Sequence, residues 1–195
     1  MASFILASQS PRRKSLLEWA EIPFEIIISD SDESYPASMH IAEVPEFIAM
    51  HKAIAVEAKI KTEQPALINH CIIAADTVVV LDNTIMGKPV DRADAIASLT
   101  KLAGKTHEVI TGVCLLHHGR MDCFSETTLV SFHELSLDQI EYYVDNYKPY
   151  DKAGGYAIQE WIGVVGIKSI QGDFYNVMGL PVSKLVQKIK QLKLN

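Results

Sequence analysis

Apolar residues in the first third of the chain alternate between short runs and helical repeats. Residues 4–7 and 23–28 are short runs rich in apolar or β-branched side chains, which is typical of strands. Between them, residues 16–20 place apolar side chains at helical spacing, and the same spacing recurs over 41–61. The pattern therefore predicts strand, helix, strand and a second, longer helix, in this order.

The most hydrophobic stretch covers residues 72–81, and its unbroken apolar character predicts a central strand buried on both faces. Asp76 interrupts this stretch. A buried carboxylate is costly unless it is paired, hydrogen-bonded or bound to a metal, so we interpret Asp76 as a functional residue. Asp82 and Asn83 then turn the chain, and residues 84–86 are expected to pair back as a short hairpin.

The second half of the chain adds hairpins to helices. Strands are predicted over 108–116 and 124–132 around a turn at 117–120, and a final hairpin over 164–170 and 174–178 around 171–173. Helices are predicted to begin after the N-cap Asp91, at the capping box Ser136–Gln139, and after Gly179–Pro181. Because strands and helices alternate early and hairpins follow, the pattern predicts an α/β protein with a mixed sheet.

Composition limits the class of protein. The chain has 195 residues, of which 48% are hydrophobic and 22% charged, as in an ordinary globular protein. The formal net charge of −6 argues against a broad nucleic-acid surface. No apolar run approaches the roughly 20 residues that span a bilayer, and no signal peptide is recognisable, so we expect no membrane contact and a cytoplasmic location. Cys71, Cys114 and Cys123 lack metal or disulfide spacing and are expected to be small buried hydrophobes.

The segment Ser8–Arg13 has the features of a phosphate site. It follows the first predicted strand and opens the first predicted helix, with Ser10 as a suitable N-cap and Pro11 at the first helical position. The free N–H groups of a helix N-terminus favour anions, and two serines with Arg12 and Arg13 strengthen that preference. We therefore interpret the segment as an anion pocket, although a simple helix start explains Ser-Pro equally well.

Further charged and polar residues fall at predicted strand ends or in the loops after them, where ligands bind in α/β sheets. The cationic candidates are Arg12, Arg13, Lys52, Lys88 and Lys152, the anionic ones are Glu33 and Asp76, and the hydroxyls are Ser8, Ser10 and Thr77. Lysines and arginines can neutralise a leaving pyrophosphate, and two carboxylates can hold a divalent metal ion and orient a water. The residues alone indicate a metal-assisted phosphoanhydride hydrolase or a phosphate-binding module.

Five motifs in one order resemble the Maf family of nucleoside triphosphate pyrophosphatases. They are residues 6–13 (LASQSPRR), 75–79 (ADTVV), 87–89 (GKP), 151–159 (DKAGGYAIQ) and 179–181 (GLP). The resemblance covers nearly the whole chain. It implies a single domain over 1–195 with an elongated mixed sheet flanked by helices and two lobes around a cleft, similar to the inosine triphosphate pyrophosphatases.

The resemblance also implies chemistry. Family members cleave between the α- and β-phosphates and release pyrophosphate, with a divalent cation such as Mg²⁺ or Mn²⁺. Asp76 matches the proposed proton acceptor, and Glu33, Lys52 and Lys88 match positions around the phosphates and the metal. A homodimer is suggested as well.

Three positions separate subgroups of the family. Arg12, Thr77 and Gln159 match the subgroup that resembles dTTP/UTP pyrophosphatases. A physical reason is available for Gln159, because an amide can bond the O4/N3 edge of thymine or uracil. The subgroup acting on 7-methyl-GTP has a bulky residue in place of the first arginine. Glu160 departs from the family, because glycine is common there. Two alternatives stay open: a 7-methyl-GTP pyrophosphatase, and a protein that inhibits septum formation and cell division by binding a partner.

Overall fold

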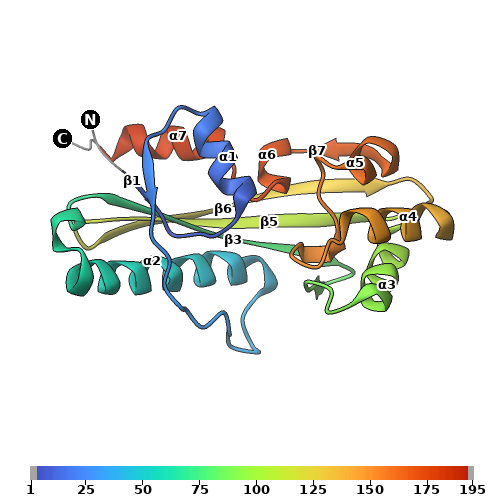
Figure 1. Ribbon diagram of the computed structural model, residues 1–195, viewed down its shortest axis with the longest axis horizontal. Helices are drawn as coiled ribbons and strands as arrows, with labels where there is room; N and C mark the ends of the chain where they lie inside the picture. Colours follow the sequence, from blue (N-terminus) through green and yellow to red (C-terminus); the bar gives the residue numbers. More distant parts are fainter. Residues whose placement is uncertain (1–3, 193–195) are drawn as a thin grey trace. The chain divides into compact units, whose positions relative to one another are not determined.

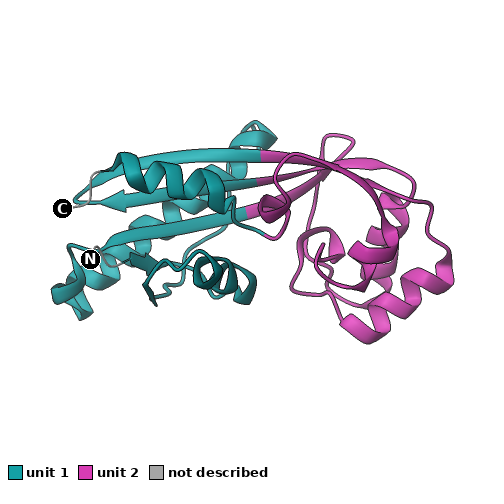
Figure 2. Cartoon of the chain, turned by 90° about the horizontal axis from the view of Figure 1, so that it is seen from above, with its two compact units in different colours: residues 1–76, 111–126, 179–195 teal, residues 77–110, 127–178 magenta. Residues whose placement is uncertain are grey.

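The computed structural model describes residues 4–192, and the chain divides into two compact units (Figure 2). The first unit comprises Met1–Asp76, Thr111–Glu126 and Gly179–Asn195, and the second comprises Thr77–Ile110 and Thr127–Met178. Three of the points where the chain passes from one unit to the other lie inside strands. Each unit is therefore built on its own section of the same strands.

The strands form one mixed sheet, as the sequence predicts. They are β1 (Phe4–Leu6), β2 (Phe24–Ile26), β3 (Cys71–Leu81), β4 (Thr84–Met86), β5 (Thr106–His117), β6 (Arg120–Phe132) and β7 (Ile167–Gln171). Their order is β2-β1-β3-β5-β6-β7, with β4 paired to β3. β1 is parallel to both β2 and β3, whereas β4 is antiparallel to β3 and β7 to β6.

The helices flank this sheet (Figure 1). They are α1 (Pro11–Trp19), α2 (Val44–Glu63), α3 (Arg92–Leu102), α4 (Leu137–Tyr147), α5 (Trp161–Gly166), α6 (Phe174–Val177) and α7 (Val182–Gln191), with short 3₁₀ turns at Ile41–Glu43, Pro65–Leu67 and Ala153–Gly155. In the first unit, α2 lies on one face of the sheet and α1 and α7 lie on the other. Within residues 4–192, no helix combines the length and the apolar character needed to cross a bilayer.

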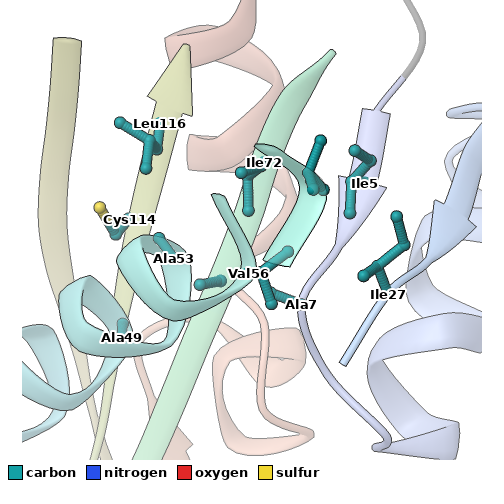
Figure 3. Packing of buried hydrophobic residues seen from close by; sticks show 11 residues of the cluster. Ile5, Ala7, Ile27, Ala49, Ala53, Val56, Ile72, Cys114 and Leu116 are labelled. Carbon is teal, nitrogen blue, oxygen red and sulfur yellow. The ribbon is translucent and has the colours of Figure 1, made fainter. Parts of the chain in front are cut away.

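The core of the first unit joins α2 to the sheet (Figure 3). Its buried members are Ile5, Ala7, Ile27, Ala49, Ala53, Val56, Ile60, Ile72, Ala74, Cys114 and Leu116. Small residues on the inner face of α2 allow the helix to approach the strands closely. The closest approach is at Gly112, where a Cβ atom would lie 2.1 Å from the backbone nitrogen of Glu46. Gly112 therefore fixes how near the start of α2 comes to β5.

The second unit packs α3 against α4, and both helices begin as the sequence predicts. The Asp91 side chain accepts from Asp94 N, and Ser136 forms a complete capping box with Gln139. On the surface, the Arg92 guanidinium binds the Asp145 carboxylate in a bidentate pair at 2.6 and 2.9 Å. The two helices are thus held together by an ion pair as well as by apolar contacts.

The predicted final hairpin is wrong. Residues 161–166 are helical, and β7 pairs with β6 over Leu129–Phe132 instead of with a strand after it. Phe174–Val177 forms a helical turn because the Asp173 side chain accepts from Tyr175 N. The polar Asn176 then points inward and donates to Val109 O at 3.0 Å. The predicted second strand is also shorter than expected and ends at Ile26.

Candidate active site

The first unit brings three of the predicted residues into direct contact. Lys52 on α2 places its Nζ atom 2.7 Å from Asp76 Oδ1 and 2.7 Å from Glu33 Oε1. Asp76 comes from the middle of β3, and Glu33 comes from the loop after β2. Two carboxylates therefore converge on one ammonium group, and each places an oxygen atom within hydrogen-bond distance of Lys52 Nζ.

The three side chains differ in burial. Lys52 is 17% exposed and Asp76 is 15% exposed, whereas Glu33 is 53% exposed. The ion pair with Lys52 offsets the cost of placing Asp76 in a hydrophobic strand. Within the described part of the chain, no hydrogen bond reaches the second oxygen, Asp76 Oδ2. This oxygen can therefore accept a proton from a bound water or substrate.

The turn Ser8–Arg13 lies beside this cluster because of strand pairing. β1 and β3 are parallel, with Leu6 opposite Ile73, so the turn after β1 continues in the direction in which β3 runs on to Asp76. Ser10 caps α1 by accepting from Arg13 N at 3.4 Å. Ser8 Oγ accepts from Ser10 N at 3.2 Å. The N-terminus of α1, the hydroxyls of Ser8 and Ser10, and Arg13 thus lie close together.

Arg13 has a structural task in addition to its charge. Its side chain is buried, its Nε atom donates to Gly179 O at 2.8 Å, and its Nη1 atom donates to Ser8 Oγ at 3.1 Å. Burial lowers the pKa of Arg13, the negative charge of Asp76 raises it, and the positive charge of Arg12 lowers it. The contact with Gly179 explains why the motif at 179–181 belongs to the same site although it lies far along the chain.

The second unit contains Thr77, Lys88 and Gln159. Thr77 is half-buried on β3, Lys88 is exposed after β4, and Gln159 is exposed just before α5. Within the described residues of this unit, no hydrogen bond or ion pair joins Lys88 to Gln159. The turn that carries Lys88 is instead fixed by its backbone, because Gly154 N donates to Gly87 O at 3.0 Å. Gly154 adopts a φ of 67°, which side-chain-bearing residues rarely adopt.

A network around Glu160 was not predicted from the sequence. Tyr143 Oη on α4 donates to Glu160 Oε2, and Ala157 N donates to Tyr143 Oη at 3.1 Å. Lys152 Nζ lies 3.4 Å from Glu160 Oε1 and 2.8 Å from Asp151 Oδ1. These bonds fix the segment 157–160 and with it the backbone of Gln159. The one signal in the sequence is Glu160 itself, which replaces the glycine that is common in the family.

A buried histidine on β5 contacts Tyr156, the residue before the same segment. His107 is 2% exposed, and its Nε2 atom lies 2.7 Å from Tyr156 Oη. Phe132 completes an aromatic cluster with these two rings. Burial lowers the pKa of His107 to about 4, and burial also raises the pKa of Tyr156. His107 is therefore neutral at pH 7 and supports the segment instead of carrying charge.

The described residues include no group of three or more His, Cys, Asp or Glu side chains arranged to hold a metal ion. Glu33 and Asp76 each place a carboxylate oxygen against the Lys52 ammonium group. Carboxylate oxygens are among the ligands that hard divalent cations prefer.

Comparison with known proteins decides the family. The family model described as Maf-like protein matches residues 3–192. The chain belongs to the Maf family. The dTTP/UTP pyrophosphatase of Parabacteroides distasonis is 48% identical over 187 residues, which are 95% of this chain and 94% of that protein. The dTTP/UTP pyrophosphatase of Phocaeicola vulgatus is 49% identical over 189 residues, 96% of this chain and 95% of that protein.

Family membership confirms the resemblance inferred from the motifs. Among solved structures, the Staphylococcus aureus Ham1 protein is similar over 68% of this chain and 72% of that chain, with a TM-score of 0.46 and 13% identity. A likeness this distant carries no conclusion about activity. The names of the Maf relatives, together with the Lys52 cluster, direct the functional proposal.

Proposed function

We propose that the protein is a nucleoside triphosphate pyrophosphatase that hydrolyses dTTP and UTP to the nucleoside monophosphate and pyrophosphate. The observation that carries the proposal is the contact of Lys52 with both Asp76 and Glu33 beside the Ser8–Arg13 turn. It combines a proton acceptor, carboxylates for a cation and donors for phosphate in one unit. The relatives named dTTP/UTP pyrophosphatase support the substrate.

In this proposal Asp76 is the proton acceptor. A water oxygen attacks the α-phosphorus atom, and Asp76 Oδ2 takes the proton that the water loses. The bond from phosphorus to the bridging oxygen breaks, and pyrophosphate leaves with that oxygen. Lys52 orients the Asp76 carboxylate by donating to Oδ1, which leaves Oδ2 to accept the proton from the attacking water. Arg12, together with Ser8 and the N–H groups of α1, stabilises the growing negative charge.

Glu33 and Asp76 are the residues that would hold a divalent cation. Bound there, Mg²⁺ or Mn²⁺ would supply positive charge to the phosphate oxygens. With two protein carboxylates, the remaining ligands would come from substrate and water, as is usual for Mg²⁺.

Substrate choice is assigned to Arg12, Thr77 and Gln159, with Lys88 as a further phosphate ligand. Gln159 can present both an amide donor and an amide acceptor to a pyrimidine edge. The Glu160 network supports this assignment, because it removes freedom from the backbone that carries Gln159. A cytoplasmic location and a homodimer belong to the same proposal, and light scattering on the purified protein would test the dimer.

The test is a product assay. The purified protein is incubated with Mg²⁺ or Mn²⁺ and dTTP, UTP, CTP, GTP or 7-methyl-GTP, and pyrophosphate and orthophosphate are measured separately. We expect pyrophosphate from dTTP and UTP. Orthophosphate alone would reject cleavage between the α- and β-phosphates, and preference for 7-methyl-GTP would reject the substrate. A folded protein that releases neither product from any nucleotide would overturn the proposal.

A further inference from the structure

Two of the three cysteines face each other on the β5–β6 hairpin. The loop of this hairpin consists of His118 and Gly119, whose φ angles of 49° and 73° are both positive, as in a type I′ turn. Such a two-residue loop fixes the register, so that His117 lies opposite Arg120. Counting back along both strands places Cys114 directly opposite Cys123. Their Sγ atoms are 2.8 Å apart, which shows that the pair is in register.

The register also determines what kind of pair this is. Pairs in an antiparallel ladder alternate between hydrogen-bonded and non-hydrogen-bonded, beginning with a hydrogen-bonded pair beside a two-residue loop. Cys114 and Cys123 therefore form a non-hydrogen-bonded pair, for which Cα atoms are typically about 4.5 Å apart. That spacing lies within the range of about 4.4–6.8 Å in which disulfides form, near its lower limit. The backbone can accept a disulfide here without moving far.

The two thiols differ in environment. Cys114 is fully buried in the core cluster with Ala49 and Ala53, whereas Cys123 is half-buried at its margin (Figure 3 labels Cys114 and both alanines). The hydrogen bond with Cys123 and burial both raise the pKa of Cys114. The hydrogen bond with Cys114 lowers the pKa of Cys123, although burial opposes this shift. Because Cys123 is the less buried of the two thiols, it is the one that an oxidant reaches first.

We propose that Cys114 and Cys123 are a redox-active dithiol that forms an intramolecular disulfide when the protein meets a hydroperoxide. The Cys123 thiolate attacks the terminal oxygen of the hydroperoxide and the O–O bond breaks. The alkoxide departs (hydroxide in the case of hydrogen peroxide), and Cys123 becomes a sulfenic acid. The Cys114 sulfur then attacks the Cys123 sulfur. The S–S bond forms, and the sulfenic oxygen leaves as water with the Cys114 proton. Thiols such as glutathione reduce the disulfide by thiol–disulfide exchange and restore the dithiol.

Cys71 provides a matched control within the same core. It lies on β3, is 1% exposed, and burial raises its pKa to about 12. It belongs to no hairpin pair, and its Sγ atom contacts the Ile72 carbonyl at 4.0 Å. Cys71 should therefore stay a thiol under conditions that oxidise the pair.

The experiment counts thiols in the folded protein before and after treatment with hydrogen peroxide, and again after a thiol reductant. We expect the count to fall from three to one and to return to three. The Cys71→Ser variant should fall from two to none. The Cys123→Ser variant should form no internal disulfide, because Cys114 has lost its partner.

Peptide mapping without reduction identifies the bond. Trypsin cleaves after Arg120 and so separates Cys114 from Cys123, and the predicted bond rejoins these two peptides with the loss of two hydrogen atoms. A bond that includes Cys71, a bond between two molecules, or Cys123 oxidised to a sulfinic acid with Cys114 still a thiol would each overturn the proposal. So would a count that stays at three.

Discussion

Lys52 in the first unit and Lys152 in the second each contact two carboxylates, yet their surroundings differ. Lys52 bonds Glu33 and Asp76 at 2.7 Å each, and its side chain is 17% exposed. Lys152 bonds Asp151 at 2.8 Å and Glu160 at 3.4 Å, and its side chain is 9% exposed. The charges are alike, but the Lys152 group is more deeply enclosed.

The main difference lies in the remaining bonds of the buried carboxylates. Glu160 uses its second oxygen to accept from Tyr143, which in turn accepts from the backbone of Ala157. Asp76 bonds Lys52 through Oδ1, and among residues 4–192 no hydrogen bond is made to its Oδ2 atom. A carboxylate tied on both oxygens fixes a loop, whereas one tied on a single oxygen can still take part in proton transfer. We therefore assign stability to the Glu160 network and chemistry to the Asp76 cluster.

The close contact between Gly112 on β5 and the start of α2 should be the most sensitive to mutation, as judged by the free energy of unfolding. In Gly112→Ala the new Cβ would lie 2.1 Å from Glu46 N and 2.3 Å from Pro45 C, so α2 must move with its Lys52. We expect a loss of about 3 kcal/mol or more in the free energy of unfolding, measured by urea denaturation. Gly87→Ala is the control, because nothing lies within 4 Å of its added Cβ. Equal stability of the two variants would contradict this view of the first unit.

The second unit should lose stability in acid through His107. Its pKa is about 4 in the folded protein against 6.5 for an ordinary histidine, so the unfolded chain binds the proton more readily. This contribution, about 3 kcal/mol at most, is complete above pH 6.5 and is lost as the pH falls toward 4. His107→Gln should flatten the fall in stability over this interval, as measured by denaturation at several pH values. The exposed His133→Gln serves as control, and an identical pH dependence in both variants would refute the prediction.

Tyr143→Phe tests the structural task of the Glu160 network. The variant removes the donor to the half-buried Glu160 and the acceptor for the buried Ala157 N. We expect a loss of about 2 kcal/mol in the free energy of unfolding. Tyr147→Phe on the same helix is the matched control, since Tyr147 stacks on Tyr143 and is 37% exposed. A Tyr143→Phe protein as stable as this control would remove the distinction between the two lysine clusters.

Gln159→Ala should have the smallest effect and should leave stability unchanged, because Gln159 is exposed. We expect the ratio of kcat/KM for dTTP over CTP to fall about tenfold, equivalent to about 1.4 kcal/mol. Gln171→Ala, also exposed in the second unit, should keep the ratio of the unmutated protein. An unchanged ratio in Gln159→Ala would withdraw the base-reading role.

Much of this architecture is predictable because local signals decide it. The caps Asp91 and Ser136, the long apolar run of β3 and the turn Asp82–Asn83 each specify an element from adjacent residues. The prediction of a final hairpin was wrong because another local signal decides this segment. The side chain of Asp173 caps a helical turn, although the apolar pattern after it favours a strand.

The site divides in a similar way. Asp76 stands out because a carboxylate in a hydrophobic strand needs a partner, and the structure supplies Lys52. Nothing local reveals that Tyr143 bonds Glu160, 17 residues away, or that Arg13 bonds Gly179, 166 residues away. These contacts depend on how the segments pack, which spacing along the chain does not encode.

The most direct test of the account compares Asp76→Asn with Asp82→Asn in the release of pyrophosphate from dTTP. Asp76 lies within β3 and Asp82 directly follows it, but Asp82 is exposed and forms a surface ion pair with Lys105. We predict that Asp76→Asn lowers kcat by about 10²–10⁴-fold while Asp82→Asn matches the unmutated protein. If Asp76→Asn stays folded and hydrolyses dTTP within a few-fold of the normal rate, Asp76 is not the proton acceptor and the central claim is contradicted.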